Sequence, residues 1–210
     1  MNDLDPRRRV LAIGLAGLAG FVDAVGFLSA DGYFVSFMSG NTTRLGVDLA
    51  ARPERALVPA LLIAGFVGGV TAGAVIATRA GARRKRAVLG LVALLLLAAA
   101  MLRGQAPAAL PLALLVSAMG ALNNTFLRDG TVSVGLTYMT GALVKLGQAI
   151  AAGLLGQPRP DGWIHAALWG GLASGALLGA LAFVHVAGWA LWLASGWAVL
   201  MLGWAWRLES

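Results

Sequence analysis

The sequence contains no cysteine, which excludes disulfide bonds, thiol nucleophiles and thiolate metal sites. Histidine is nearly absent as well: there are two, His165 and His185, which lie twenty residues apart. We therefore expect no metal site and no cofactor. The sequence also lacks a Ser/His/Asp constellation or a paired-carboxylate motif, so we expect no enzymatic activity, and an enzyme acting on lipid is the weakest functional alternative.

Charged residues are scarce. They make up 12% of the chain against 59% hydrophobic residues, and the mean hydropathy is +0.81. Residues 162–206 contain no Asp, Glu, Lys or Arg, which is enough for two helical crossings of roughly 20 residues each. The sequence therefore predicts an all-α, polytopic membrane helical bundle, with residues 1–210 forming a single integral membrane domain.

Basic residues outnumber acidic ones by 16 to 9, giving a net charge of +7. These cations cluster in short loops beside apolar runs, where Lys and Arg determine topology and face anionic lipid. We therefore expect the lipid bilayer as a partner and no nucleic acid.

The sequence repeats itself at an offset of about a hundred residues. The repeat predicts duplication of an ancestral unit, with repeat A at about 10–103 and repeat B at about 107–206. The matched blocks are Phe37-Met38-Ser39-Gly40 with Tyr138-Met139-Thr140-Gly141, Arg44-Leu45-Gly46 with Lys145-Leu146-Gly147, Gly20-x-x-Asp23 with Gly120-x-x-Asn123, and Gly68-Gly69-x-x-x-Gly73 with Gly170-Gly171-x-x-x-Gly175.

Eight apolar segments can be drawn, and the basic clusters limit how many of them span the membrane. Short basic loops stay in the cytoplasm, so the clusters at 7–9 and 79–86 should share a side. This favours about six spanning helices plus two broken or re-entrant segments, at 33–51 and 131–155, with both termini cytoplasmic. The alternative is eight spans. The favoured count makes the repeats inverted, which is typical of secondary transporters with a site near the membrane midplane.

Each broken segment carries polar residues at membrane depth, where they usually mark a pathway or a site. In the run Ser39-Gly40-Asn41-Thr42-Thr43-Arg44, we expect a helix interruption and then a fresh helix start, with Ser or Asn as the N-cap. A helix start attracts anions. Arg44 and Lys145 would face a shared cavity, lined also by Gln148. The alternative is that the hydroxyls bond to their own helix and the cations extend to the interface.

Asp23 lies in the middle of the first apolar segment, too far from its end for a short side chain to reach water. It is either a proton-coupling carboxylate or substrate ligand, or it forms a structural salt bridge to Arg44 or Lys145. Asn123, at the equivalent position, and Asn124 add amides at similar depth. Asp48 follows Arg44 by four residues, a spacing that predicts an ion pair on one helix face.

The blocks Gly20-Phe21-Val22-Asp23-Ala24, Phe37-Met38-Ser39-Gly40-Asn41-Thr42 and Tyr138-Met139-Thr140-Gly141 resemble the YoaK family of bacterial multi-pass membrane proteins. The resemblance covers about residues 10–206 and implies location in the bacterial inner membrane. Ser39 stands where the family commonly has Thr. The family has no established biochemical activity, so the resemblance supplies no residue roles.

These observations favour a small secondary transporter or channel for a polar, anionic solute, with a site between the two repeats. A membrane scaffold or assembly protein, whose polar residues brace helices, is the alternative, and a homodimer fits either function. The residues expected to bind the solute are Asp23, Ser39, Gly40, Asn41, Thr42, Arg44, Asn123, Asn124, Thr140, Gly141, Lys145 and Gln148.

Overall fold

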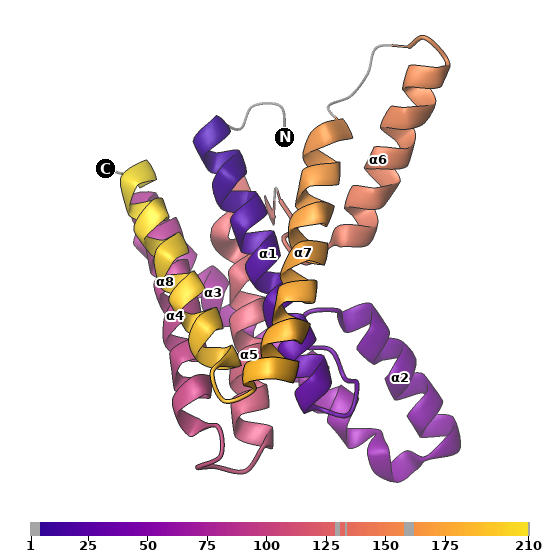
Figure 1. Ribbon diagram of the computed structural model, residues 1–210, viewed down its shortest axis with the longest axis vertical. Helices are drawn as coiled ribbons and strands as arrows, with labels where there is room; N and C mark the ends of the chain where they lie inside the picture. Colours follow the sequence, from indigo (N-terminus) through magenta and orange to yellow (C-terminus); the bar gives the residue numbers. More distant parts are fainter. Residues whose placement is uncertain (1–4, 129–130, 133, 158–161, 210) are drawn as a thin grey trace.

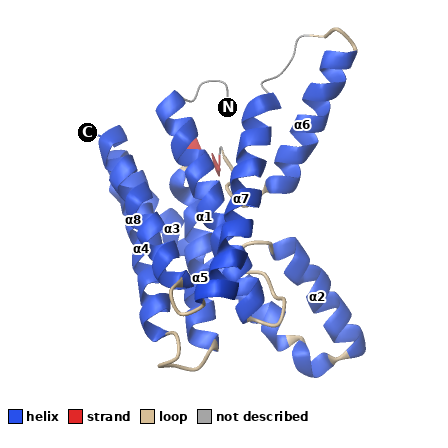
Figure 2. Cartoon of the chain, viewed as in Figure 1, coloured by secondary structure: helices blue, strands red, loops and turns tan. Residues whose placement is uncertain are grey.

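The computed structural model describes residues 5–128, 131–132, 134–157 and 162–209. These residues form eight α-helices and one short antiparallel hairpin, coloured red in Figure 2, in which Leu127 pairs with Val132. The all-helical prediction is confirmed, apart from this small hairpin. The elements are α1 (Pro6–Ser29), α2 (Met38–Ala51), α3 (Leu57–Ala80), α4 (Arg84–Leu102), α5 (Ala109–Leu122), β1 (Leu127–Arg128), β2 (Thr131–Val132), α6 (Met139–Leu154), α7 (Gly162–Val186) and α8 (Ala190–Glu209).

Within the described residues, three helical stretches are long and apolar enough to cross a membrane: Pro6–Ser29, Pro53–Leu102 and Gly162–Val186. The second of these contains both α3 and α4, which reverse direction at Gly81, where φ is +54°. Shorter apolar helices lie at Ala109–Thr125 and Met139–Leu154. Large apolar side chains face outward on nearly every helix, as expected of a surface that meets lipid rather than water.

Both segments that the sequence predicts to be broken are interrupted. In the first, the helix begins only at Met38, and in the second only at Met139. With 14 and 16 residues, α2 and α6 rise about 21 and about 24 Å at 1.5 Å per residue, less than the roughly 30 Å of a bilayer's hydrocarbon core. Figure 1 shows α2 and α6 extending from the middle of the molecule toward opposite ends.

The most extensive packing joins α1 to α7, and it depends on glycine. A Cβ on Gly175 would collide with the backbone of Gly17, and a Cβ on Gly179 would collide with the backbone of Phe21. Residue numbers therefore rise together along the contact, so the two helices run parallel. Backbones can approach this closely because glycine has no side chain, a recurrent device between membrane helices.

A second parallel pair, α3 and α5, is packed in the same way. A Cβ on Gly69 would collide with the backbone of Ser117, and one on Gly73 would come within 3.0 Å of the Ala121 backbone. From the other side, a Cβ on Gly120 would collide with the carbonyl of Phe66. Helix α4 packs against α5 and α8, and α8 also contacts α1. The buried core runs through these contacts.

The two chain termini lie at the same end of the molecule (Figure 1). There the indole nitrogen of Trp204 donates to the carbonyl of Arg7 over 3.2 Å, and Glu209 pairs with Lys85 and Arg86. We call this the terminal end. The basic stretches at 7–9 and 79–86 meet here, as the charge distribution predicts.

Candidate functional site

Asp23 holds the non-helical loop that precedes α2. Its Oδ1 accepts hydrogen bonds from the backbone N–H groups of Val35, at 2.9 Å, and Ser36, at 2.7 Å. A carboxylate away from water needs such compensation, because an isolated charge in an apolar environment is very costly. The alternative of a salt bridge to Arg44 or Lys145 is not among the ion pairs of the described residues.

Asn41 fixes the same loop from inside α2. The side chain is fully buried; its Nδ2 donates to the carbonyl of Phe34 over 2.7 Å, and its Oδ1 accepts from the N–H of Phe34 over 3.1 Å. The prediction that Ser39 or Asn41 caps the helix is wrong: both lie within α2, and the N-cap, Phe37, makes no side-chain cap bond. The amide instead satisfies both backbone groups of a residue outside the helix.

The remaining small polar residues of α2 are mostly occupied by their own helix. The hydroxyl of Thr42 donates to the carbonyl of Met38 over 2.9 Å, and that of Thr43 to the carbonyl of Ser39 over 3.2 Å. Thr42 and Ser39 are exposed. Gly40 leaves space for an aromatic ring, since a Cβ there would come within 2.8 Å of a ring carbon of Phe37. Local bonding, the alternative interpretation of the hydroxyls, describes both threonines.

Arg44 lies half-buried in an open pocket of about 780 Å³ at the end of the molecule away from the termini. Its guanidinium sits 4.9 Å from the centre of the Tyr33 ring. A cation over an aromatic face is attracted by the ring quadrupole. The residues that line the pocket are Asp31, Tyr33, Thr43, Arg44, Val47, Asp48, Arg52, Arg55 and Val58. We call this the Arg44 pocket.

The acidic partner predicted for Arg44 is engaged elsewhere. Asp48 is buried, and its carboxylate pairs with Arg52 at 3.2 Å and accepts from the hydroxyl of Tyr33 at 3.1 Å. Asp48 therefore pairs with the arginine four residues after it, Arg52, rather than with the one four residues before it. The predicted Arg44–Asp48 ion pair is wrong. The guanidinium groups of Arg44 and Arg55 line the pocket without a carboxylate ion pair among the described residues, and the carboxylate of Asp31 lines it as well.

In the second half, Asn123 lies where the repeat matches it to Asp23, and it also holds a loop. Its Oδ1 accepts from the hydroxyl of Thr137 over 3.2 Å, while its Nδ2 donates to the carbonyl of Met119 over 3.0 Å. The neighbouring Asn124 donates to the carbonyl of Val70 on α3 over 3.0 Å. Both asparagines are buried. Each amide therefore joins elements of the fold.

The other predicted site residues lie on α6, away from the Arg44 pocket. Figure 1 shows α6 extending toward the terminal end, opposite to α2. The structure therefore does not bring Arg44 and Lys145 together on neighbouring helices, and the shared cavity stays a prediction. The α6 residues, all exposed, are Thr140, Gly141, Lys145 and Gln148.

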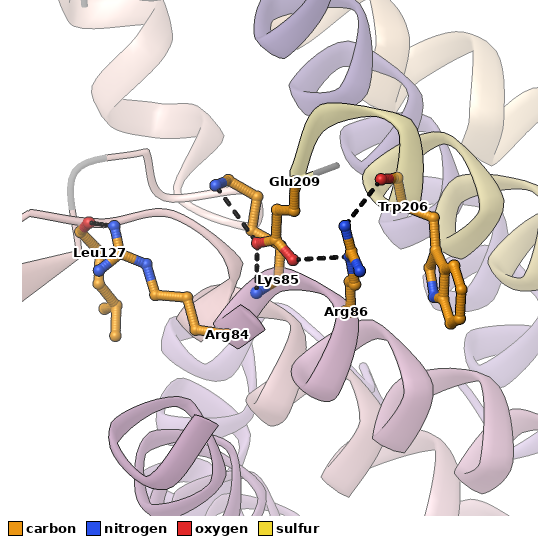
Figure 3. Close-up of polar contacts among 6 residues, drawn as sticks. All are labelled: Arg84, Lys85, Arg86, Leu127, Trp206 and Glu209. Carbon is orange, nitrogen blue, oxygen red and sulfur yellow. Dashed lines mark hydrogen bonds and ion pairs between the residues drawn. The ribbon is translucent and has the colours of Figure 1, made fainter. Parts of the chain in front are cut away.

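A buried ionic cluster closes the terminal end (Figure 3). The Glu209 carboxylate lies 3.6 Å from Lys85 Nζ and 3.2 Å from Arg86 Nε, and it accepts from the Lys85 backbone N–H in the first turn of α4 over 3.1 Å. Arg84 donates to the carbonyl of Leu127 over 2.8 Å, which attaches the hairpin. Sequence reasoning missed this cluster, although an acidic residue ending a charge-poor segment could have drawn attention to it.

Known proteins similar to this chain carry the same membrane character. Residues 11–204 match the DUF1275 family, described as a protein of unknown function. The UPF0700 transmembrane protein RA0705 of Rhizobium meliloti (strain 1021) is 38% identical over 209 residues, which cover 96% of this chain and 90% of the relative. No solved structure matches. The expected family resemblance is thus confirmed, and the chain belongs to the DUF1275 (UPF0700) family of multi-pass transmembrane proteins.

Proposed function

We propose that this protein is a small secondary transporter or channel for a polar, anionic solute. The observation that carries the proposal is the Arg44 pocket. There a half-buried guanidinium, on a short helix that follows a break in the first apolar region, lines a pocket of about 780 Å³. Discontinuous helices form the solute sites of many secondary transporters. The pocket would bind the solute through Arg44 and Arg55, with Tyr33 as the wall on which Arg44 rests.

The arrangement of the helices supports the predicted inverted repeats, at about 10–103 and 107–206. Helix α1 packs closely on α7, and in the same way its counterpart in the second half, α5, packs closely on α3. The two short helices, α2 and α6, point in opposite directions (Figure 1). In each half, a polar residue late in the first helix or just beyond it holds the loop before the short helix: Asp23 in one, Asn123 in the other. Two related halves of opposite orientation are common in secondary transporters that work by alternating access.

The same reasoning assigns an orientation in the bacterial inner membrane. The terminal end carries most of the lysines and arginines and would lie in the cytoplasm. Helix α2, which carries Arg44 and points away from the terminal end (Figure 1), would then lie on the periplasmic side. Because the chain has no cysteine, single cysteines can be introduced without background. Labelling from the outside should reach residues 52–55 and not residues 79–86, and the reverse result would contradict the orientation.

A direct test of the function compares Arg44→Gln with Arg79→Gln, an exposed arginine at the terminal end. The proteins are purified and screened by thermal shift against small carboxylates, phosphate and sulfate, and any stabilising anion is then used for uptake into proteoliposomes. We expect Arg44→Gln to lose stabilisation and uptake and Arg79→Gln to retain both. Lys145→Gln tests the predicted shared cavity. If no anion distinguishes wild type from Arg44→Gln, the proposal is wrong.

A scaffold or assembly protein is the second function that a specific observation favours. Four of the predicted site residues form hydrogen bonds to other parts of the chain, as residues that stabilise helix packing do: Asp23, Asn41, Asn123 and Asn124. This function predicts that Arg44→Gln leaves all solute fluxes unchanged. It also predicts that a partner protein copurifies at a fixed ratio.

A further inference from the structure

The loop between α1 and α2 is attached residue by residue to the helices around it. This matters because the first of these residues, Tyr33, is also a wall of the Arg44 pocket. The attachments are Tyr33 to Arg44 and Asp48, Phe34 to Asn41, and Val35 and Ser36 to Asp23. The two residues that Asp23 holds, Val35 and Ser36, therefore lie two and three positions along the backbone from this wall of the pocket.

Asp23 is a carboxylate that can take up a proton, whereas the other attachment points of this loop segment are the neutral amide of Asn41, the guanidinium of Arg44 and the carboxylate of Asp48, which is already paired with Arg52. Its ionised carboxylate accepts both backbone N–H groups. Hydrogen bonds to an ionised acceptor are roughly twice as strong as those between neutral groups. A proton on the carboxyl group would therefore weaken both attachments at once.

We infer that the Asp23 carboxylate is a proton-binding site that controls the loop at residues 33–36 and, through Tyr33, the affinity of the Arg44 pocket for its anion. The inference rests on the proposed function and adds the coupling ion to it. With Asp23 ionised, the loop is held and Tyr33 supports Arg44. When Asp23 takes up a proton, Val35 and Ser36 are released and the pocket loses a wall. Proton uptake and anion binding then oppose each other, and the coupling is reciprocal.

Other titratable or charged groups near α1 must be separated from Asp23. Helix α5 carries none in its described residues, and those of α7 and α8 lie in the first or last turns. Histidine in particular titrates between about pH 5 and 8. The groups on elements that pack on α1 or on the loop are His165, His185, Arg207, Glu209, Asp31, Tyr33, Arg44 and Asp48. His165→Gln and His185→Gln, which lie outside the pocket lining, therefore serve as controls for Asp23→Asn.

The second half of the chain supplies a matched reference for the loop itself. Asn123 holds Thr137 there, and an amide does not ionise in this pH range. Phe37 and Tyr138 are the N-cap residues of the two short helices, and both are exposed. A nitroxide attached to Phe37→Cys reports the loop held by Asp23, and one attached to Tyr138→Cys reports the loop held by Asn123.

The first experiment measures nitroxide mobility in nanodiscs by electron paramagnetic resonance at about pH 5 and about pH 8. We expect mobility at position 37 to increase at the lower pH in an otherwise wild-type background, and mobility at position 138 to stay constant. With Asp23→Asn, position 37 should be mobile at both values. A label at position 37 that ignores pH, or responds equally with Asp23→Asn, overturns the inference. This readout needs no anion, so it is independent of the proposed function.

The second experiment measures the affinity for the stabilising anion across the same pH range. In wild type, and in the His165→Gln and His185→Gln controls, the dissociation constant should rise at least about tenfold as the pH falls. In Asp23→Asn it should be high and independent of pH. A wild-type protein that binds the anion with equal affinity at both pH values overturns the coupling. A wild-type protein that binds no anion at any pH overturns the proposed function.

Discussion

The closest helix contacts of the fold make a steric prediction with a neighbouring control. In Gly175→Ala, the new Cβ would lie 2.8 Å from the Cα of Gly17, where ordinary carbon contacts are about 3.5–4.0 Å. Helices α1 and α7 would have to separate by roughly 1 Å. Gly170, on the same helix, has no atom within 4 Å of its Cβ position. Gly170→Ala therefore changes the same chemical group on the same helix without the collision.

The magnitude follows from this difference. Both substitutions gain the same helix propensity, up to about 1 kcal/mol, so it cancels between them. What remains is the overpacking term, about 1–3 kcal/mol. We expect Gly175→Ala to melt roughly 2–12 °C below Gly170→Ala in one detergent, followed by tryptophan fluorescence. The same difference is expected on α3: Gly69→Ala should melt below Gly68→Ala, because a Cβ on Gly69 would collide with the Ser117 backbone and a Cβ on Gly68 has no atom within 4 Å. Equal melting temperatures within both pairs would refute the packing.

Two further substitutions test the polar contacts. Asn41→Ala should lower the free energy of unfolding by about 1–3 kcal/mol, because both backbone groups of Phe34 lose their buried partner, and urea titration in mild detergent would measure it. Glu209→Gln should lower the free energy of unfolding by about 3–5 kcal/mol, because Lys85 and Arg86 lose a largely buried counter-charge while the shape is kept. Salt screens exposed charges much more than buried ones, so the loss of stability in Glu209→Gln should persist in 1 M salt. A loss that disappears in 1 M salt would contradict the burial of the cluster.

The sequence was sufficient to predict the course of the helices and the two interruptions. Continuous apolar runs separated by charged or Gly-rich breaks mark the ends of membrane helices, and a Ser-Gly-Asn sequence within such a run signals a break. It did not locate the break: α2 begins at Met38 rather than after Gly40. The reason is tertiary. Asn41 bonds backwards to Phe34, so the polar residue that suits a cap is used inside the helix.

The partners of the charged residues were less accessible to sequence reasoning. The i,i+4 rule allows Asp48 to pair with either Arg44 or Arg52, and the stacking of Arg44 on Tyr33 decides between them. Tyr33 lies eleven residues away in a loop, a contact that no helical period predicts.

Glycines spaced by four residues leave the alignment of the two repeats ambiguous. The sequence blocks match Gly69 to Gly171. The closest contacts instead favour Gly175 as the counterpart of Gly69, one turn further along, because Gly69 meets Ser117 and Gly175 meets Gly17.

The parallel pair of α1 and α7 joins an early helix to a late one, and this constrains how the protein is made. Helix α1 leaves the ribosome long before α7, its main partner, has been synthesised. Until then, its glycine-lined face has only lipid or an insertion factor against it. We therefore expect the amino-terminal half to be unstable on its own and chains whose synthesis stops before residue 162 to be cleared by membrane proteases.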